Sequence, residues 1–142
     1  MIGWCLTRAL AVVALGGLSA GCVPSTVGGV RGYTAFLATA RVERHVSAQP
    51  APVVADCFRR TAKFLPRSTF VPTPEGGVHY RLAGYGLWFE EILFTPDATG
   101  STIEIRSSGA YAGNWVRMLV RDRLEPLGQC IANKGGSKEE VR

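Results

Sequence analysis

The sequence is poor in the residue types from which metal centres and common catalytic sites are built. Its 142 residues include only two histidines and four cysteines. No two cysteines form a C-x-x-C pair, so the ligand spacing of a structural zinc site is missing. The sequence also lacks a G-x-S-x-G nucleophile turn and a glycine-rich phosphate loop that opens a helix. It therefore predicts no metal, no cofactor and no recognisable catalytic triad.

Acidic residues are also in the minority, with eleven Asp and Glu against sixteen Lys and Arg and a formal net charge of +5. Apolar residues make up 46% of the chain and charged residues 19%, which is the balance of a globular protein and not of a disordered one. The length suits one domain, since domains cluster at roughly 100–150 residues. A chain of this length cannot hold a multidomain enzyme.

The apolar run from Ala9 to Leu18 is too short for a membrane-spanning helix, which needs about 20 apolar residues. Arg8 precedes the run and the small residues Ser19-Ala20-Gly21 follow it. A charged start, a short apolar run and small residues at a cleavage point are typical of a secretory signal peptide. The sequence therefore predicts that residues 1–21 are a signal peptide and that the protein is exported.

The segment Leu18-Ser19-Ala20-Gly21-Cys22 resembles the lipobox of bacterial lipoproteins. Ala20 and Gly21 match that pattern, whereas the leucine that usually stands three positions before the cysteine is replaced by Ser19, with Leu18 one position earlier. The resemblance implies cleavage before Cys22, a diacylglyceryl group on its thiol and an acyl chain on its new amine. It also implies a lipid bilayer as a partner, through acylated Cys22.

Two interpretations of the cleavage point stay open, because the small residues before Cys22 also fit an ordinary signal peptidase site. Cysteine parity favours lipidation. Export would carry Cys22, Cys57 and Cys130 into an oxidising compartment, and acylation of Cys22 removes the odd thiol. Aspartate after the cysteine tends to retain enteric lipoproteins in the inner membrane. Here Val23 follows, so the resemblance implies the outer membrane, facing the periplasm, with the inner membrane as the alternative.

We expect three segments after the signal peptide. Residues 22–32 and 133–142 are rich in glycine, serine and other small or polar residues without apolar periodicity, which predicts a flexible tether and a flexible tail. Residues 33–132 remain for a single folded domain with one modest core.

Within that domain, alternation predicts a strand from about Leu37 to Ser47, although residues 34–40 also fit a helix. An amphipathic helix is predicted from Val53 to Leu65, between two prolines. From Ser68 to Ser108 the period becomes two, which predicts an antiparallel meander of three strands and a possible short strand near Phe70.

A final helix begins near Tyr111 or after Asn114 and is expected to kink at Pro126. The order is β-α-β-β-β-α. It predicts a two-layer α+β fold, in which two helices cover one face of an antiparallel β-meander sheet.

The two helices bring a pair of cysteines together in this fold. Cys57 lies on or beside the apolar stripe of the first helix, and Cys130 lies at the end of the last. We expect a disulfide between them, worth about 4 kcal/mol in the chain-entropy model. Two unpaired buried cysteines are the alternative.

The central strand segment LWFEEILF, Leu87 to Phe94, offers two candidate sites. Glu90 and Glu91 point to opposite faces, so they cannot flank one bond as a catalytic pair, and an ion pair with Arg81 or Arg106 is expected instead. Strict alternation separates the row Trp88, Ile92 and Phe94 from the row Leu87, Phe89 and Leu93. Because two helices cover one face only, one row should be open for a partner or ligand. The predicted contact residues are Tyr80, Trp88, Ile92 and Phe94, from an aromatic set that also contains Tyr85, Phe89 and Tyr111.

Basic side chains on the outer faces of the helices form a second candidate surface. The residues concerned are Arg59, Arg60 and Lys63 on the first helix and Arg117, Arg121 and Arg123 on the last. They could contact anionic lipid headgroups, lipopolysaccharide or peptidoglycan, although a solvated helix face explains them equally well. Nucleic acid is excluded as a partner by export.

Taken together, the sequence predicts a membrane-anchored, non-enzymatic periplasmic lipoprotein that binds or scaffolds another envelope component, for envelope assembly or secretion. The alternative is a binding module for a lipid, glycan or small ligand, and an envelope hydrolase is third. The residues set neither the oligomeric state nor the identity of the partner.

Overall fold

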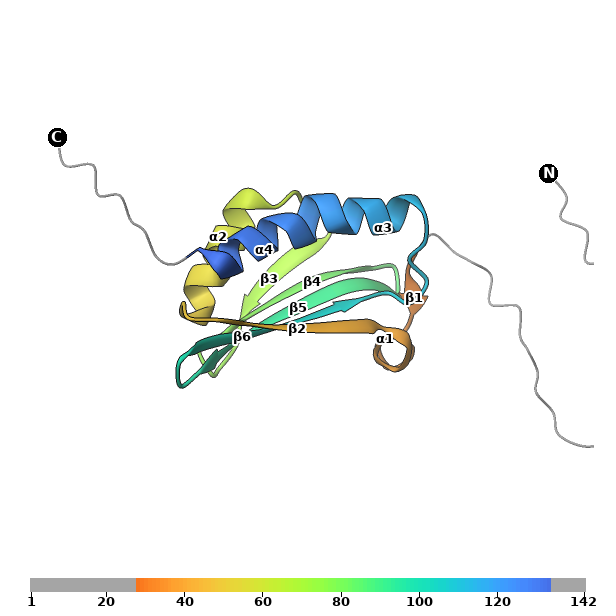
Figure 1. Ribbon diagram of the computed structural model, residues 1–142. Helices are drawn as coiled ribbons and strands as arrows, with labels where there is room; N and C mark the ends of the chain where they lie inside the picture. Colours follow the sequence, from red (N-terminus) through yellow and green to blue (C-terminus); the bar gives the residue numbers. More distant parts are fainter. Residues whose placement is uncertain (1–27, 134–142) are drawn as a thin grey trace, which may run out of the picture.

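The protein forms two main layers, an antiparallel sheet and the long helices on one of its faces (Figure 1). This computed structural model describes residues 28–133. The predicted signal peptide, the lipidation site Cys22 and the tail from residue 134 lie outside the described residues. The predicted α+β class is confirmed.

Six strands form the sheet, and all pair antiparallel. Their order is β2-β6-β5-β4-β3, with the short β1 beside the beginning of β5. The bounds are Val30–Arg31 for β1, Arg41–Ser47 for β2, Ser68–Pro72 for β3, Val78–Gly84 for β4, Leu87–Asp97 for β5 and Gly100–Ser107 for β6. The predicted meander is therefore present, and the strand near Phe70 extends it.

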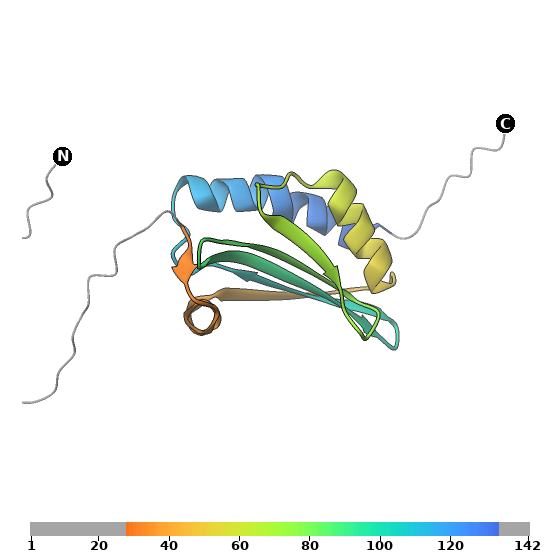
Figure 2. The same ribbon diagram turned by 180° about the vertical axis from the view of Figure 1, so that it is seen from behind.

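The helices lie on both faces but unequally (Figure 2). Helix α2, Ala51–Thr61, covers one face together with a long C-terminal helix. That helix consists of α3, Asn114–Leu119, a π-helical turn, Val120–Leu124, and α4, Glu125–Ala132. The π-helical turn precedes Pro126, where the sequence predicted a kink. The short α1, Tyr33–Thr39, packs near the beginning of β5 on the opposite face.

Several predicted boundaries were wrong. The chain is helical before Arg41, so the strand predicted from Leu37 begins four residues later as β2. Strand β2 lies at the edge of the sheet, and its valines are exposed, Val46 to 75%. Helix α2 ends at Thr61 and not at Leu65. The backbone is extended at Ala62, and the Lys63 amide donates to the carbonyl of Asp122 on the other helix.

The folded part also begins earlier than residue 33. Gly28 and Gly29 are buried, and Val30–Arg31 pair with Leu87 and Trp88 of β5. A Cβ at Gly28 would lie 2.9 Å from the Trp115 ring, so only glycine allows this approach. Residues 28–32 are therefore part of the domain and not of a tether.

A β-bulge in β5 overturns the prediction of two apolar rows. Leu82 pairs with Glu90 and Ala83 pairs with Trp88, which leaves Phe89 as an extra residue on β5. The extra residue resets the alternation. As a result Leu87, Phe89, Ile92 and Phe94 all face the helices, and Trp88 and Leu93 face the other side.

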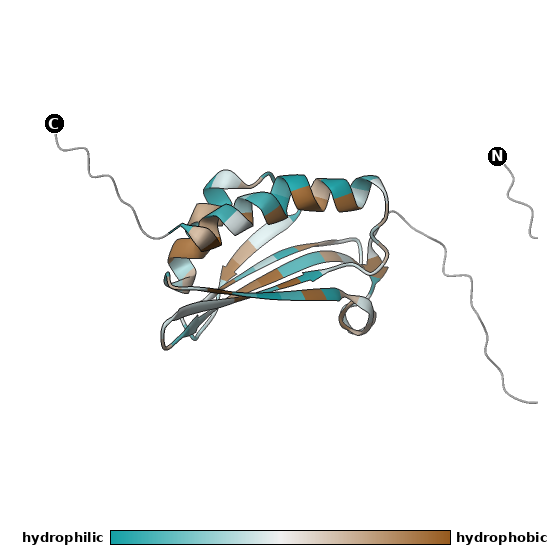
Figure 3. Cartoon of the chain, viewed as in Figure 1, coloured by the Kyte–Doolittle hydropathy of each residue, from teal (hydrophilic) through white to brown (hydrophobic). Residues whose placement is uncertain are grey.

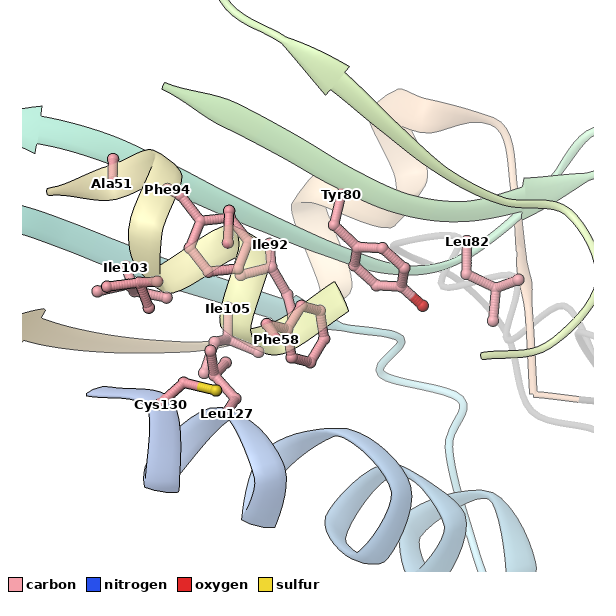
Figure 4. Close-up of a cluster of buried hydrophobic side chains, with 12 residues drawn as sticks. Ala51, Phe58, Tyr80, Leu82, Ile92, Phe94, Ile103, Ile105, Leu127 and Cys130 are labelled. Atoms are coloured by element: carbon pink, nitrogen blue, oxygen red, sulfur yellow. The ribbon is translucent and has the colours of Figure 1, made fainter. Parts of the chain in front are cut away.

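The core fills the space between the sheet and the two long helices (Figure 4). Phe58 lies at its centre, with ring centroids 5.5 Å from Tyr80 and 5.8 Å from Phe94. Figure 3 shows the banding of hydrophobic and hydrophilic residues along the C-terminal helix that lets one side of it close this core. Leu127 and Cys130 are the parts of α4 that enter the core.

Cys57 on α2 and Cys130 on α4 form a disulfide, as the sequence predicted. Their Cα atoms are 5.8 Å apart, and 73 positions separate them in the chain. The bond ties the two helices that cover the sheet, so it closes the helical layer at the point where α2 and α4 pack together.

Candidate functional site

The predicted contact residues do not form an open platform. Tyr80, Ile92 and Phe94 are at most 1% exposed and belong to the core beneath the helices. Trp88 does face the other side of the sheet, but α1 covers part of it, with the Tyr33 ring 4.4 Å and the Phe36 ring 6.0 Å away. The prediction of these four residues as one contact surface was wrong, because Tyr80, Ile92 and Phe94 face the helices and the bulge places Trp88 on the other face.

The face opposite the two long helices carries ion pairs in place of an apolar row. Arg106 pairs with Glu91, as predicted, and also with Glu104, which in turn accepts from Arg44 at 2.6 Å. Glu91 is fully buried and also contacts the His79 Nε2 atom at 3.0 Å. Burial raises the pKa of Glu91, but the hydrogen bonds from His79 and Arg106 more than offset this and hold the pKa below its usual value. These side chains satisfy one another, so this face is a poor apolar docking surface.

Five of the six predicted basic residues lie at the surface but do not act as one patch. Arg60 pairs with Asp56 of its own helix at 3.1 Å, and Arg121 pairs with Asp122 at 2.6 Å. Arg59 stacks over Phe70, with its guanidinium 4.6 Å from the ring centre. The two remaining residues, Lys63 and Arg117, are exposed, and Arg117 donates to the side chain of Asn114. Local carboxylates therefore neutralise part of the expected charge.

Arg123 was predicted on the outer face together with the other arginines, and this was wrong. It is 1% exposed and donates to the fully buried carboxylate of Glu90, from Nε at 2.8 Å and from Nη2 at 2.5 Å. Tyr111 and Tyr80 donate to the same carboxylate at 2.8 Å and 3.3 Å. Burial, together with the charge of Glu90, raises the pKa of both tyrosines far above its usual value. Helical spacing could have predicted the burial of Arg123, because this residue stands four positions from both Leu119 and Leu127, which are buried.

A cleft opens at the end of the sheet that carries β1, beside the turn between β4 and β5. We call it the Tyr85 cleft, after the exposed residue at that turn. It has a volume of about 260 Å³ and a mostly apolar lining. The lining residues are Leu65, Pro66, Arg67, Leu82, Ala83, Gly84, Tyr85, Leu87, Phe89 and Trp115. The Trp115 ring stacks between Phe89 and Tyr111, at 5.5 Å and 5.3 Å, which fixes one wall of the cleft.

Arg67 and Tyr85 form the rim of this cleft, and both have a left-handed backbone conformation. Their φ angles are 75° and 55°, and they are the two non-glycine residues with positive φ among residues 28–133. The guanidinium of Arg67 lies 3.8 Å from the centre of the Tyr85 ring. The left-handed conformation costs an L-residue roughly 1–2 kcal/mol, and glycine would avoid that cost. Two strained residues that meet at the rim of one cleft mark it as a candidate functional site.

A second hollow lies on the other side of the same hairpin, and we call it the arginine hollow. Its volume is about 290 Å³, and Arg67 borders it as well as the Tyr85 cleft. Arg81 and Trp88 are also in its lining. The end of the hairpin therefore has an apolar cleft on one side and a basic hollow on the other, with Arg67 and Tyr85 between them.

The beginning of the described chain packs at this same end. Gly28 lies against Trp115, and Gly29 lies against Phe89, with a Cβ at Gly29 only 2.8 Å from the Phe89 ring. Both aromatic residues line the Tyr85 cleft. Any segment that precedes Gly28 therefore reaches the domain beside the cleft.

Comparison with known proteins finds no family model, no curated protein and no solved structure that matches the chain. Within residues 28–133, no helix is both long enough and apolar enough to span a bilayer.

The backbone strain at Tyr85 leads to a stability prediction. The turn between β4 and β5 has two central residues with positive φ, Tyr85 and Gly86, as in a type I′ turn, for which Asn-Gly is preferred. Tyr85→Asn should therefore raise the free energy of unfolding by about 0.5–1 kcal/mol, since relief of strain exceeds the lost stacking with Arg67. Urea unfolding followed by circular dichroism measures it. Tyr85→Phe keeps both the strain and the ring and should leave the midpoint unchanged; equal midpoints for all three proteins would contradict the strain at Tyr85.

Proposed function

We propose that the protein is a lipoprotein anchored through acylated Cys22, in the outer membrane facing the periplasm, and that its domain is a non-enzymatic binding module. The single observation that carries the binding role is the Tyr85 cleft with its strained rim. The anchor is supported by the lipobox-like segment that ends at Cys22. The bound group is an apolar part of another envelope component.

The distance between anchor and cleft supports a role near the membrane. Cys22 and Gly28 are six residues apart. Six residues reach at most about 21 Å when fully extended. Because Gly28 packs beside the Tyr85 cleft, an anchor at Cys22 keeps the cleft within that distance of the bilayer.

The size of the cleft argues against a drug-sized ligand. At about 260 Å³ it lies just below the roughly 300–1,000 Å³ of ordinary small-molecule sites. Such a volume fits one apolar side chain or a segment of one hydrocarbon chain. A large glycan would also find few polar partners among the lining residues.

The anchor is tested by the Cys22→Ser variant of the full chain. Wild-type protein should incorporate a labelled fatty acid and resist extraction of the membrane with carbonate, and Cys22→Ser should show no incorporation. Cys5→Ser serves as the matched control, because Cys5 lies within the predicted signal peptide and should not affect labelling. Equal labelling of the Cys22→Ser variant would contradict the lipoprotein assignment.

The binding role is tested by photo-crosslinking in cells. A photoreactive residue at position 85, at the rim of the cleft, should capture an envelope component. The same residue at position 98, in the exposed turn between β5 and β6, should capture much less. Equal capture from both positions would contradict a specific site at the cleft.

A further inference from the structure

The Tyr85 end of the domain combines three features that no other part of residues 28–133 combines. Tyr85 is the most exposed of the large hydrophobic side chains in this range, at 81%. It stacks with Arg67 over an apolar cleft, and the arginine hollow lies behind it. Aromatic rings with apolar bodies and polar tips, next to basic groups, are enriched where proteins meet the membrane surface.

The positive charge at this end has no acidic partner within the described part of the chain. Arg31, Arg67 and Arg81 have no carboxylate within ion-pair distance among residues 28–133. Arg31 lies by the same turn, since its Nη1 atom would be 3.8 Å from a Cβ at Gly86. By contrast, Arg44, Arg60, Arg106 and Arg121 each pair with a carboxylate. A cluster of unneutralised arginines favours an anionic partner.

We infer that the Tyr85 end docks on the surface of a bilayer that contains anionic phospholipid. An acyl chain enters the Tyr85 cleft, and phosphate oxygens accept from Arg67 and its neighbours Arg31 and Arg81. The inference deepens the proposed function, since it names lipid as the component that the cleft binds. The reach of about 21 Å from Cys22 to Gly28 favours the bilayer over a distant partner.

The strain at the rim fits this role. Asparagine or glycine at positions 67 and 85 would relieve the left-handed backbone but remove the guanidinium and the ring from the surface. The native residues therefore trade stability for an arginine and a tyrosine at the tip of the hairpin. This trade also provides variants that lose the surface without losing the fold.

The experiment uses a chain of residues 22–142 with Cys22→Ser, which contains the whole folded unit 28–133 and carries no acyl chain. Co-sedimentation is measured with large vesicles of phosphatidylcholine alone and of phosphatidylcholine with 30 mol% phosphatidylglycerol. We expect binding to the anionic vesicles at least tenfold tighter than to the neutral ones. Arg67→Asn combined with Tyr85→Asn should weaken binding to the anionic vesicles at least tenfold, on the basis of about fivefold for each basic group at a membrane surface plus the lost ring.

Arg60→Asn combined with Val53→Asn is the matched control, because it removes one arginine and one exposed apolar side chain from α2. This control should bind like the parent chain. If both double variants bound the anionic vesicles equally weakly, the inference would be overturned, because net charge alone would then explain the binding. Absence of binding to either vesicle, with crosslinking from position 85 to a protein, would also overturn it but would leave the proposed binding role intact. The acyl-labelling experiment with Cys22→Ser tests the anchor alone. The vesicle experiment uses a chain without an acyl group, so its result does not depend on the anchor.

Discussion

Replacement of Arg123 by methionine is expected to lower the free energy of unfolding by about 3–5 kcal/mol, because it leaves a buried carboxylate without its cation. Arg123 and Glu90 are both about 1% exposed, and two hydrogen bonds join them. Small domains have a total stability of roughly 5–15 kcal/mol, so the variant should be near the limit of folding. Urea unfolding followed by circular dichroism gives the difference.

A second variant separates the loss of the charge pair from the loss of packing. Arg123→Met combined with Glu90→Gln removes both charges and leaves an amide whose carbonyl oxygen accepts from one of Tyr111 and Tyr80 and whose NH2 group donates to the hydroxyl oxygen of the other. This double variant should recover most of the lost stability. Arg121→Met is the matched surface control and should change little, since Arg121 is exposed. A loss below about 1 kcal/mol for Arg123→Met would contradict a buried ion pair, because burial of an unpaired charge costs more than that.

Loss of the Cys57–Cys130 disulfide is expected to destabilise the domain by about 4 kcal/mol, through the added freedom of the unfolded chain. The bond spans 73 positions and joins the two helices that cover the sheet. The variant Cys57→Ala combined with Cys130→Ala should unfold at a much lower urea concentration than the oxidised wild type.

Chemical reduction of the disulfide should cause the same loss of stability without mutation. Wild-type protein in excess reductant should approach the midpoint of the double alanine variant, and reductant should have no effect on that variant. Thiol counting on the unfolded, non-reduced domain should find Cys57 and Cys130 unreactive. If reductant left the wild-type midpoint unchanged, the bond would contribute nothing to stability.

Local sequence patterns were enough to predict those helices and strands whose apolar periodicity is uninterrupted. The amphipathic helix before Pro66 and the alternating strands after Val78 follow from spacing alone, because one face of each is apolar. The pairing of Cys57 and Cys130 followed from the placement of both helices on one face of the sheet. Residues 34–40 fitted both a helix and a strand, so the sequence left the choice open. The structure has the helix α1 there, and Tyr33 and Phe36 of this helix contact Trp88.

The candidate site depended on details that periodicity does not contain. One extra residue, Phe89, put Trp88 on the face opposite to Ile92 and Phe94, with which strict alternation had grouped it, and the long helices cover the face of those two residues. A bulge has no reliable sequence signal, so strict alternation gave the wrong face. The partnership of Arg67 with Tyr85 depends on the backbone conformation of two separate loops, which only their packing against each other reveals.

The sequence by itself determined the α+β class, the order of its main elements and the separation of Glu90 from Glu91 onto opposite faces, because these depend on spacing along the chain. The disulfide followed once both helices were placed on one face of the sheet. Tertiary structure alone decided that both glutamates would be buried, that Glu90 would pair with Arg123, that β2 would be an exposed edge, and that Tyr85 would remain at the surface. The physical reason is that burial and pairing are set by which distant segments meet, and spacing along the chain does not contain that information.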